Sequence, residues 1–253
     1  MRKSLVLAIV VLAVAAGAVW AQLTGASPQT TLDRARIAWE KRADPIQSRE
    51  AVDLFQAAAA AEPTSYEALW EGARACYFYG YVTRESAPDS EKMQIFTDGI
   101  ERARRAVALR PDAVEGHFWL GVLLGVYGEA KGIFKSLSLV PEIKAEMERC
   151  LKLDPAVEGW GPDRLLGRMY YKLPFFKGGD NNLSREHLER SLAGAPGVAE
   201  TRVYLAETYK SLGRKADAIA QLRTVLTMTP DPQSAPEHPT VKARAEVLLK
   251  KWS

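Results

Sequence analysis

The chain has 253 residues, of which 47% are hydrophobic and 26% charged, with 18 Gly and 14 Pro. This composition is typical of a globular protein and excludes collagen-like and disordered chains. Removing Arg2 and Lys3 with an N-terminal leader leaves 32 basic and 31 acidic residues, a net charge of +1. A nearly neutral protein has no overall electrostatic reason to bind nucleic acid or an anionic membrane surface, so nucleic acid is not expected as a partner.

The amino terminus has the zones of a secretory signal peptide. Two basic residues precede an apolar run from Leu5 to about Val19, and the sequence Val19-Trp20-Ala21 then precedes Gln22. The sequence therefore predicts a signal peptide over residues 1–21, cleaved after Ala21, and a mature protein that is periplasmic or otherwise exported. The alternative is an uncleaved N-terminal membrane anchor at the short limit for spanning a bilayer. Membrane contact is expected only with that anchor.

Five prolines each close a segment that has the apolar spacing of an α-helix. They are Pro63, Pro111, Pro155, Pro196 and Pro230. The residues five, eight and twelve positions before each proline are small or apolar in every copy, and these offsets place them on one helix face. Proline then ends the helix, because it cannot donate the next backbone hydrogen bond.

A second helical pattern follows each of the first four prolines and is centred on a small residue. These residues are Gly72, Gly121, Gly167 and Ala206. The two patterns together, clearest from Leu205 to Pro230, resemble the tetratricopeptide repeat family, which implies helix-turn-helix pairs stacked into a solenoid.

We therefore predict an all-α, tetratricopeptide-like solenoid of about five helix pairs. Residues 22–30 form a linker, residues 31–230 the repeat domain, and residues 231–253 a second linker with a C-terminal capping helix. That last helix is expected from Thr240 to Trp252, because its apolar residues form one stripe.

Three of the repeats contain extra residues. The small residue and the closing proline are 24 positions apart in the last copy, but 39, 34 and 29 apart in the three before it, an excess of 15, 10 and 5 residues. We expect this extra length to lie between the first and second helices. Equivalent turns of a solenoid lie along one edge, so this edge is the predicted binding edge.

The inserted segments supply the candidate contacts for a partner or an apolar ligand. On a continuous helix the glycines of the second segment would form one stripe. Such a stripe indicates the close approach of a partner chain, an apolar ligand or another helix of the solenoid. The aromatic residues either stack on a ligand or belong to the core. The candidates are Tyr79, Tyr81, Gly121, Gly125, Gly128, Gly132, Phe134, Phe175 and Phe176.

The third inserted segment contains the run Gly-Gly-Asp-Asn-Asn at residues 178–182. Its oxygen-bearing residues are contiguous and lack the alternating spacing of a calcium loop, so a structural turn is expected. Ser184 is the expected cap of the next helix.

Sequence motifs for catalysis are missing. The chain has no His-Glu-x-x-His, phosphate loop, dinucleotide glycine signature or Gly-x-Ser-x-Gly elbow, so neither an enzyme nor a cofactor is expected. The three histidines are expected to be packed or surface residues and not metal ligands. Cys76 and Cys150 fall in different kinds of helix, and we do not expect them to pair.

Four short motifs add a second resemblance. They are His117–Gly121, Ala130–Ser136, Leu165–Tyr170 and Lys177–Gly179. Together they resemble the T component of tripartite ATP-independent periplasmic (TRAP) transporters, and the same layout is similar to the animal regulators of microtubule dynamics. The transporter resemblance implies a periplasmic helical-repeat protein that associates with a solute-binding protein and offers a passage for an apolar ligand. Some relatives are lipid-anchored, but no cysteine stands directly after the leader here to carry the lipid.

Two functions follow as hypotheses. The first is an accessory protein-interaction component of a TRAP-type uptake system, with an apolar small molecule as a further ligand. The alternative is a general cell-envelope scaffold that binds a peptide or a partner protein in its concave groove.

Overall fold

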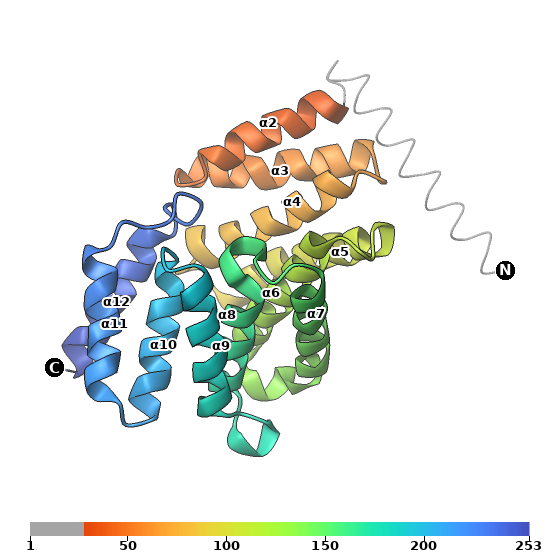
Figure 1. Ribbon diagram of the computed structural model, residues 1–253. Helices are drawn as coiled ribbons and strands as arrows, with labels where there is room; N and C mark the ends of the chain where they lie inside the picture. Colours follow the sequence, from red (N-terminus) through yellow and green to blue (C-terminus); the bar gives the residue numbers. More distant parts are fainter. Residues whose placement is uncertain (1–27, 253) are drawn as a thin grey trace. The chain divides into compact units, whose positions relative to one another are not determined.

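The computed structural model describes residues 28–252, which are almost entirely helical and contain no strand (Figure 1). The predicted leader at residues 1–21 lies outside the described residues. The first helices of the repeats are α2 (Pro28–Glu40), α4 (Tyr66–Phe78), α6 (Val114–Lys131), α8 (Val157–Lys172) and α10 (Ala199–Ser211). The second helices are α3 (Pro45–Ala61), α5 (Asp89–Leu109), α7 (Val140–Leu153), α9 (Asn181–Gly194) and α11 (Lys215–Thr227), and α12 (His238–Trp252) follows. This order confirms the predicted all-α repeat fold.

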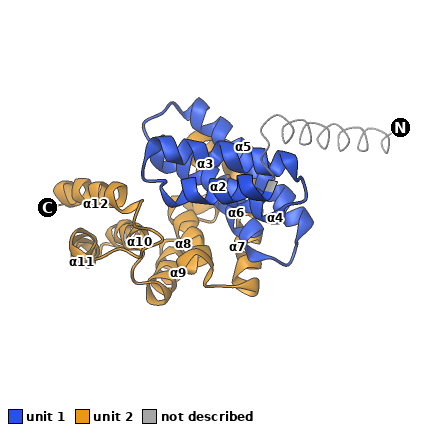
Figure 2. Cartoon of the chain, turned by 90° about the horizontal axis from the view of Figure 1, so that it is seen from above, with its two compact units in different colours: residues 1–123 blue, residues 124–253 orange. Residues whose placement is uncertain are grey.

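The chain divides into two compact units, residues 1–123 and 124–253, which Figure 2 shows in different colours. The boundary falls inside α6. In unit 1, α2 packs against α3 and α4 against α5. In unit 2, α8 packs against α9, α10 against α11, and α12 against both α10 and α11. Within the part of the chain described, no helix is both long enough and apolar enough to cross a membrane.

The five predicted closing prolines mark the ends of the second helices. Each of these helices ends two or three residues before its proline. All fifteen residues at the positions five, eight and twelve before the prolines are buried. The helix face predicted from this spacing is therefore the face that forms the core.

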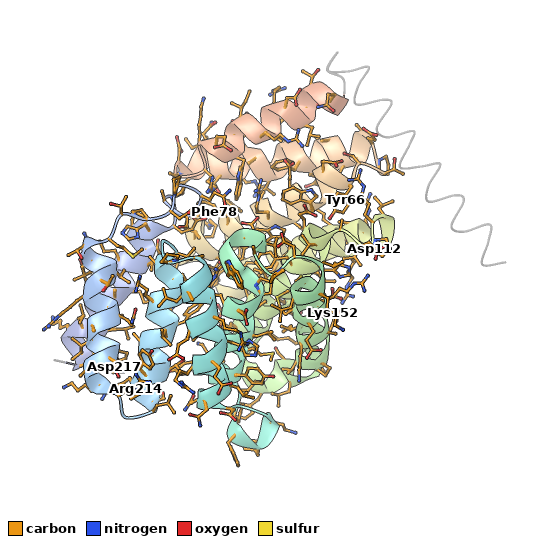
Figure 3. All side chains as sticks on the ribbon, viewed as in Figure 1. Tyr66, Phe78, Asp112, Lys152, Arg214 and Asp217 are labelled. Atoms are coloured by element: carbon orange, nitrogen blue, oxygen red, sulfur yellow. The ribbon has the colours of Figure 1, made fainter. Side chains whose placement is uncertain are left out.

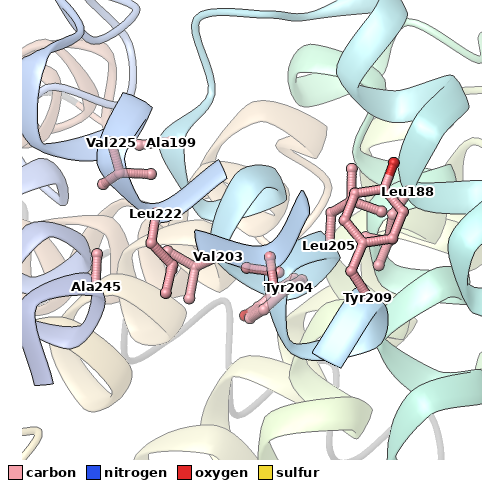
Figure 4. Packing of buried hydrophobic residues seen from close by; sticks show 11 residues of the cluster. Leu188, Ala199, Val203, Tyr204, Leu205, Tyr209, Leu222, Val225 and Ala245 are labelled. Carbon is pink, nitrogen blue, oxygen red and sulfur yellow. The ribbon is translucent and has the colours of Figure 1, made fainter. Parts of the chain in front are cut away.

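The last repeat shows this packing in its most regular form (Figure 4). Leu222 and Val225 of α11 are fully buried in one cluster with Val203 and Leu205 of α10, and Figure 4 shows Leu222 beside Val203. The predicted stripe of the last helix closes this cluster, with Ala245 buried and Trp252 partly buried against it. Burying Leu and Val side chains contributes about 1.5–3 kcal/mol each, so this cluster is a main source of stability in unit 2.

The first helices need small residues where a second helix approaches closely. Gly167 of α8 lies against Leu188 of α9, and a β-carbon at position 167 would be 2.6 Å from the Leu188 Cγ. No carbon pair tolerates that distance, so the side chain of Leu188 takes the space that another residue would fill. This contact explains the small residue in the repeat pattern.

The extra residues are distributed differently from the prediction. Three residues connect α10 to α11, whereas eight connect α6 to α7 and eight connect α8 to α9. The α8–α9 connection therefore holds the whole five-residue excess of its repeat. In the repeat before it, half of the excess lengthens α6 instead.

The first inserted segment also becomes mainly helix. A π-helical turn, η1 (Tyr79–Thr83), extends α4, and α5 has 21 residues where α11 has 13. Helical residues satisfy their own backbone hydrogen bonds, whereas residues in a connection must find other partners. The prediction that all the extra length lies between the helices was wrong for this reason.

The start of α8 contains a distortion that the sequence does not indicate. Glu158, Gly159 and Trp160 have left-handed backbone angles, with φ of 49°, 62° and 57°. Such angles cost non-glycine residues about 1–3 kcal/mol each. The Arg164 guanidinium donates hydrogen bonds to the carbonyl oxygens of Glu158 and Gly159 at 3.0 and 2.9 Å, which holds this turn in place.

Candidate functional site

Unit 2 exposes three phenylalanines on its two inserted connections. The side chains of Phe134, Phe175 and Phe176 are 72%, 91% and 71% exposed. Among the side chains that the structure describes, no other aromatic ring is exposed to a comparable degree. We call these three residues, with the connections 132–139 and 173–180 that hold them, the phenylalanine edge.

The first connection starts where α6 ends at Lys131. Gly132 has a φ of +94°, a conformation that favours glycine, and it turns the chain out of the helix. The 3-10 helix η2 (Ile133–Leu139) then folds back, and the Ser136 hydroxyl donates to the Gly132 carbonyl oxygen at 3.1 Å. This short, hydrogen-bonded segment holds Phe134 on the surface.

The second connection is held by backbone hydrogen bonds. Pro174 ends the extended residues after α8, and the 3-10 turn η3 (Phe175–Lys177) follows. The Gly179 N–H donates to the Pro174 carbonyl oxygen at 3.1 Å, and the Asp180 N–H donates to the Tyr170 carbonyl oxygen at 3.1 Å. A β-carbon at Gly179 would overlap the Leu173 carbonyl oxygen, so this position requires glycine.

The Gly-Gly-Asp-Asn-Asn run starts the next helix. The Asp180 carboxylate accepts hydrogen bonds from the N–H groups of Asn182 and Leu183 at 2.7 and 3.2 Å, and it therefore caps α9. The prediction that Ser184 is the cap was wrong. Ser184 is buried inside α9, where its hydroxyl forms a hydrogen bond with that of Thr208 at 2.8 Å.

Both phenylalanine-bearing connections lie at the same end of unit 2. Figure 1 shows them at the lower end, where α6 and α8 finish. The short α10–α11 connection lies at this end too, and Figure 3 labels Arg214 of this connection and Asp217 of α11. The Arg214 Nε lies 2.7 Å from the Asp217 carboxylate, which forms an ion pair. Phe134, Phe175 and Phe176 thus share an edge within unit 2, as the sequence predicts for the second and third insertions.

Lysines flank both connections. Lys131 and Lys177 are exposed, and the Lys172 ammonium lies 3.5 Å from the Glu129 carboxylate. Residues 130–141 and 170–179 contain four lysines and no acidic residue. The edge thus combines exposed aromatic rings with local positive charge in an otherwise nearly neutral chain.

The other predicted aromatic candidates lie in unit 1 and take part in its internal packing. Tyr79 lies in η1 beneath the Arg49 guanidinium, which is 5.5 Å from the ring centroid. The Tyr81 ring stacks on that of Tyr77 with centroids 5.4 Å apart. Both tyrosines are half-buried.

The predicted glycine stripe is interrupted. Gly121 is buried in α6. A β-carbon at Gly125 would lie 3.6 Å from the Leu165 side chain, and one at Gly128 would lie 3.3 Å from that of Ser136. Gly132 is outside the helix, so the prediction of four glycines on one continuous helix was wrong. At Gly125 and Gly128 the neighbours belong to unit 2 itself, which favours close internal packing over a ligand stripe.

Sequence reasoning missed a charged cluster that joins three helices of unit 2. Arg168 of α8 donates to the Glu207 carboxylate of α10 at 2.7 Å, and Arg244 of α12 binds the same carboxylate. The Arg168 guanidinium also lies 4.3 Å from the Tyr204 ring centroid. These residues are far apart in the sequence, so no local spacing could have indicated the cluster.

A second missed cluster lies between α8 and α9. The buried Asp163 carboxylate is 2.6 Å from His187 Nδ1, and Arg190 donates to it at 3.0 Å. Burial alone raises the pKa of Asp163, but the hydrogen bonds with His187 and Arg190 outweigh it and lower that pKa. His187 is therefore packed against a carboxylate and the Tyr170 ring, in line with the expectation for the histidines.

More than half of the chain matches a known protein family. The family described as regulator of microtubule dynamics protein 1-3 matches residues 31–172. The chain belongs to this family. The matched region contains Phe134 and ends at Lys172, so Phe175 and Phe176 lie beyond it.

The curated relatives of the family are longer than the region they share with this chain. Regulator of microtubule dynamics protein 3 of Rattus norvegicus is 26% identical over 166 residues, which cover 59% of this chain and 34% of the rat protein. The protein of the same name from Mus musculus is 25% identical over the same shares of both chains. The chain thus spans about a third of the length of these relatives.

A solved structure supports the fold independently. A thermophilic TPR protein of Thermus thermophilus is similar with a TM-score of 0.63 and 20% identity, over 88% of this chain and 100% of that one. Repeat proteins of this architecture form extended concave surfaces that many of them use for binding.

Proposed function

We propose that this family member is an exported helical-repeat scaffold and an accessory component of a TRAP-type solute-uptake system. Its partner is a protein, such as the solute-binding protein of that system, and an apolar small molecule is a further ligand. The scaffold itself carries out no reaction. Export rests on the predicted signal peptide, and the transporter role rests on the resemblance of its four short motifs.

The exposed phenylalanine edge is the observation that carries a binding role. The repeat core is complete without these rings, because all fifteen core positions of the second helices are buried. Exposing three phenylalanines to water is unfavourable, and exposed apolar groups of this kind mark interaction sites. Phe134, Phe175 and Phe176 are therefore the proposed contact residues of unit 2.

The remaining candidates keep weaker support. Tyr79 and Tyr81 retain partial exposure and are proposed as a contact of unit 1. Gly125, Gly128 and Gly132 are proposed to shape the end of α6 and the connection that holds Phe134, and Gly121 is proposed to allow close packing further back in that helix.

Export is tested by amino-terminal sequencing of the chain from a bacterial envelope fraction. The proposal expects a mature chain that starts at Gln22 and is released when the membranes are washed. Recovery of chains with intact Met1 in washed membranes would show instead that the leader is an uncleaved membrane anchor.

The partner is tested by cross-linking in intact cells, followed by capture of the tagged full chain and mass spectrometry. Enrichment of a solute-binding protein or a permease subunit supports the transporter role. Enrichment of envelope-assembly proteins instead supports the alternative, a general scaffold that holds a peptide or protein in its concave groove. Recovery of the same proteins with an unrelated tagged envelope protein would remove the support for both.

A further inference from the structure

We infer that the phenylalanine edge docks on the surface of a lipid bilayer that contains anionic lipids. This inference rests on the proposed function, because export places the edge beside a membrane, and it names what the edge contacts. The protein partner is then bound by the remaining helical surface while the edge holds unit 2 at the membrane.

The shape of the edge suits shallow insertion. Phe175 and Phe176 are adjacent residues on a 3-10 turn of three residues, and Phe134 lies on the neighbouring connection at the same end of unit 2. The backbone of the second turn forms its own hydrogen bonds, such as that from the Gly179 N–H to the Pro174 carbonyl oxygen. Aromatic side chains of such a turn can enter the interfacial layer without exposing unsatisfied backbone groups to it.

The charges near the edge complement an anionic surface. Lys131 and Lys177 are exposed and lie three residues before Phe134 and directly after Phe176 in the chain, and the Lys131 ammonium lies 5.6 Å from the centroid of the Tyr127 ring. Their long side chains can reach lipid headgroups while the phenylalanine rings lie deeper. The nearest acidic groups are compensated. Glu129 lies 3.5 Å from Lys172, and the Asp180 carboxylate accepts two backbone N–H groups at the start of α9. Glu142 lies in the first turn of α7, where a helix favours negative charge.

The composition of the edge favours lipid over protein. Interfaces between proteins are enriched in Phe, Tyr, Trp and Arg and depleted in lysine, and their binding hot spots are enriched in Trp, Tyr and Arg. The phenylalanine edge contains Phe, which suits both kinds of partner, but it also contains Lys, and neither connection contains Trp, Tyr or Arg. Exposed aromatic rings with flanking lysines are instead the combination that binds bilayer interfaces, through apolar insertion and attraction to anionic headgroups.

The test uses the full chain as recovered from the envelope, with one thiol introduced on the edge. The two native cysteines are buried, so the substitution Phe175→Cys supplies the accessible thiol for an environment-sensitive fluorescent label. The matched control carries the label at Ile46→Cys, a 74% exposed apolar position of unit 1. Phosphatidylcholine vesicles with about one third phosphatidylglycerol provide the anionic surface.

The expected result is a blue-shifted, stronger emission at position 175 on these vesicles and no change at position 46. The local label makes this readout independent of any contribution from the amino terminus. In flotation with the same vesicles, replacing Phe134, Phe175 and Phe176 by Ala should lower the affinity at least about tenfold. Lys131→Gln with Lys177→Gln should reduce binding to the anionic vesicles and remove their advantage over pure phosphatidylcholine.

An unchanged label at position 175 on anionic vesicles would overturn the inference. If the triple Ala variant also lost the protein partner in detergent-solubilised extract, the edge would be a protein-binding site, and the proposed function would stand without membrane docking. The expected pattern is that the triple Ala variant still captures the protein partner in detergent but no longer binds the vesicles. Vesicle binding without any specific partner would uphold the inference and contradict the scaffold role.

Discussion

The α8–α9 and α10–α11 pairs bury the same three positions of their second helices, yet their connections differ in length and chemistry. In α10–α11, three residues join the helices and an Arg214–Asp217 ion pair lies beside them. In α8–α9, eight residues present Phe175 and Phe176 to solvent. The core therefore does not dictate what the connection exposes, and the exposed rings are a property of the insertion.

The two pairs also fill their buried positions differently. In α11 these positions are Ala218, Leu222 and Val225. In α9 they are Ser184, Leu188 and Ser191, and the two serine hydroxyls form hydrogen bonds with threonines of α10 at 2.8 and 3.4 Å. Buried polar groups require such partners. The α9 helix thus depends on specific hydrogen bonds where α11 depends on apolar packing.

The largest effect is expected in the regular pair. Leu222→Ala should lower the free energy of unfolding by about 2–5 kcal/mol, because it leaves a cavity at a fully buried site. Chemical denaturation measures the loss, with Leu183→Ala at a 38% exposed site as the control. A similar, small effect of both substitutions would show that α11 does not depend on its apolar face.

The α8–α9 pair is tested through its buried carboxylate. Asp163→Asn should cost about 1–3 kcal/mol at neutral pH, because charged hydrogen bonds with His187 and Arg190 are weakened. The pKa of Asp163 is lowered in the folded state, so its stabilisation is present above the unfolded value of about 3.9 and is lost as the pH falls below it.

Unfolding curves of both proteins at several pH values provide the measurement. The difference in stability should be greatest near neutral pH and shrink below about pH 4. A difference that stays constant down to about pH 2 would mean that the charge of Asp163 does not stabilise the pair.

A buried carboxylate of unit 1 provides a similar test with a smaller expected loss of stability. Glu71 is buried and accepts hydrogen bonds from Arg36 at 2.7–3.1 Å, which explains a charged residue beside the small Gly72 of the repeat pattern. Glu71→Gln should cost about 1–2 kcal/mol, since an amide keeps the shape but loses the charge. Thermal unfolding measures it, and Glu67→Gln serves as a more exposed control on the same helix. Equal shifts for both variants would contradict a special role of the buried pair.

The smallest effect on stability is expected at the edge itself. Phe134→Ala and Phe176→Ala should each change the free energy of unfolding by less than about 0.5 kcal/mol, because both rings are exposed. Melting curves and helical spectra provide the check. A loss of about 3–5 kcal/mol in the free energy of unfolding, as for a core phenylalanine, would show that these rings stabilise the fold.

The repeat core could be predicted from the sequence because it depends on local spacing. The offsets before each proline define a helix face, and the same residues form the buried face in the structure. The capping helix followed from its own apolar stripe, which packs through Ala245 and Trp252.

The remaining features depend on contacts between distant residues. Nothing near Asp163 in the sequence indicates that His187 and Arg190 reach its carboxylate from the next helix. Likewise, the left-handed turn at residues 158–160 depends on hydrogen bonds from Arg164 to backbone carbonyls. The exposed phenylalanines were identified as candidates, but only their surroundings decide between core and surface.

The reactivity of the two buried cysteines reports local unfolding in each unit of the protein. Cys76 lies in unit 1 and Cys150 in unit 2, and both are buried thiols. Burial raises the pKa of Cys76, and it raises that of Cys150 to about 12, so neither reacts readily while its helix stays packed. A thiol reagent therefore modifies each cysteine at the rate at which its surroundings open. Equal rates would report one cooperative opening of the chain, and unequal rates would show two parts that exchange with water independently.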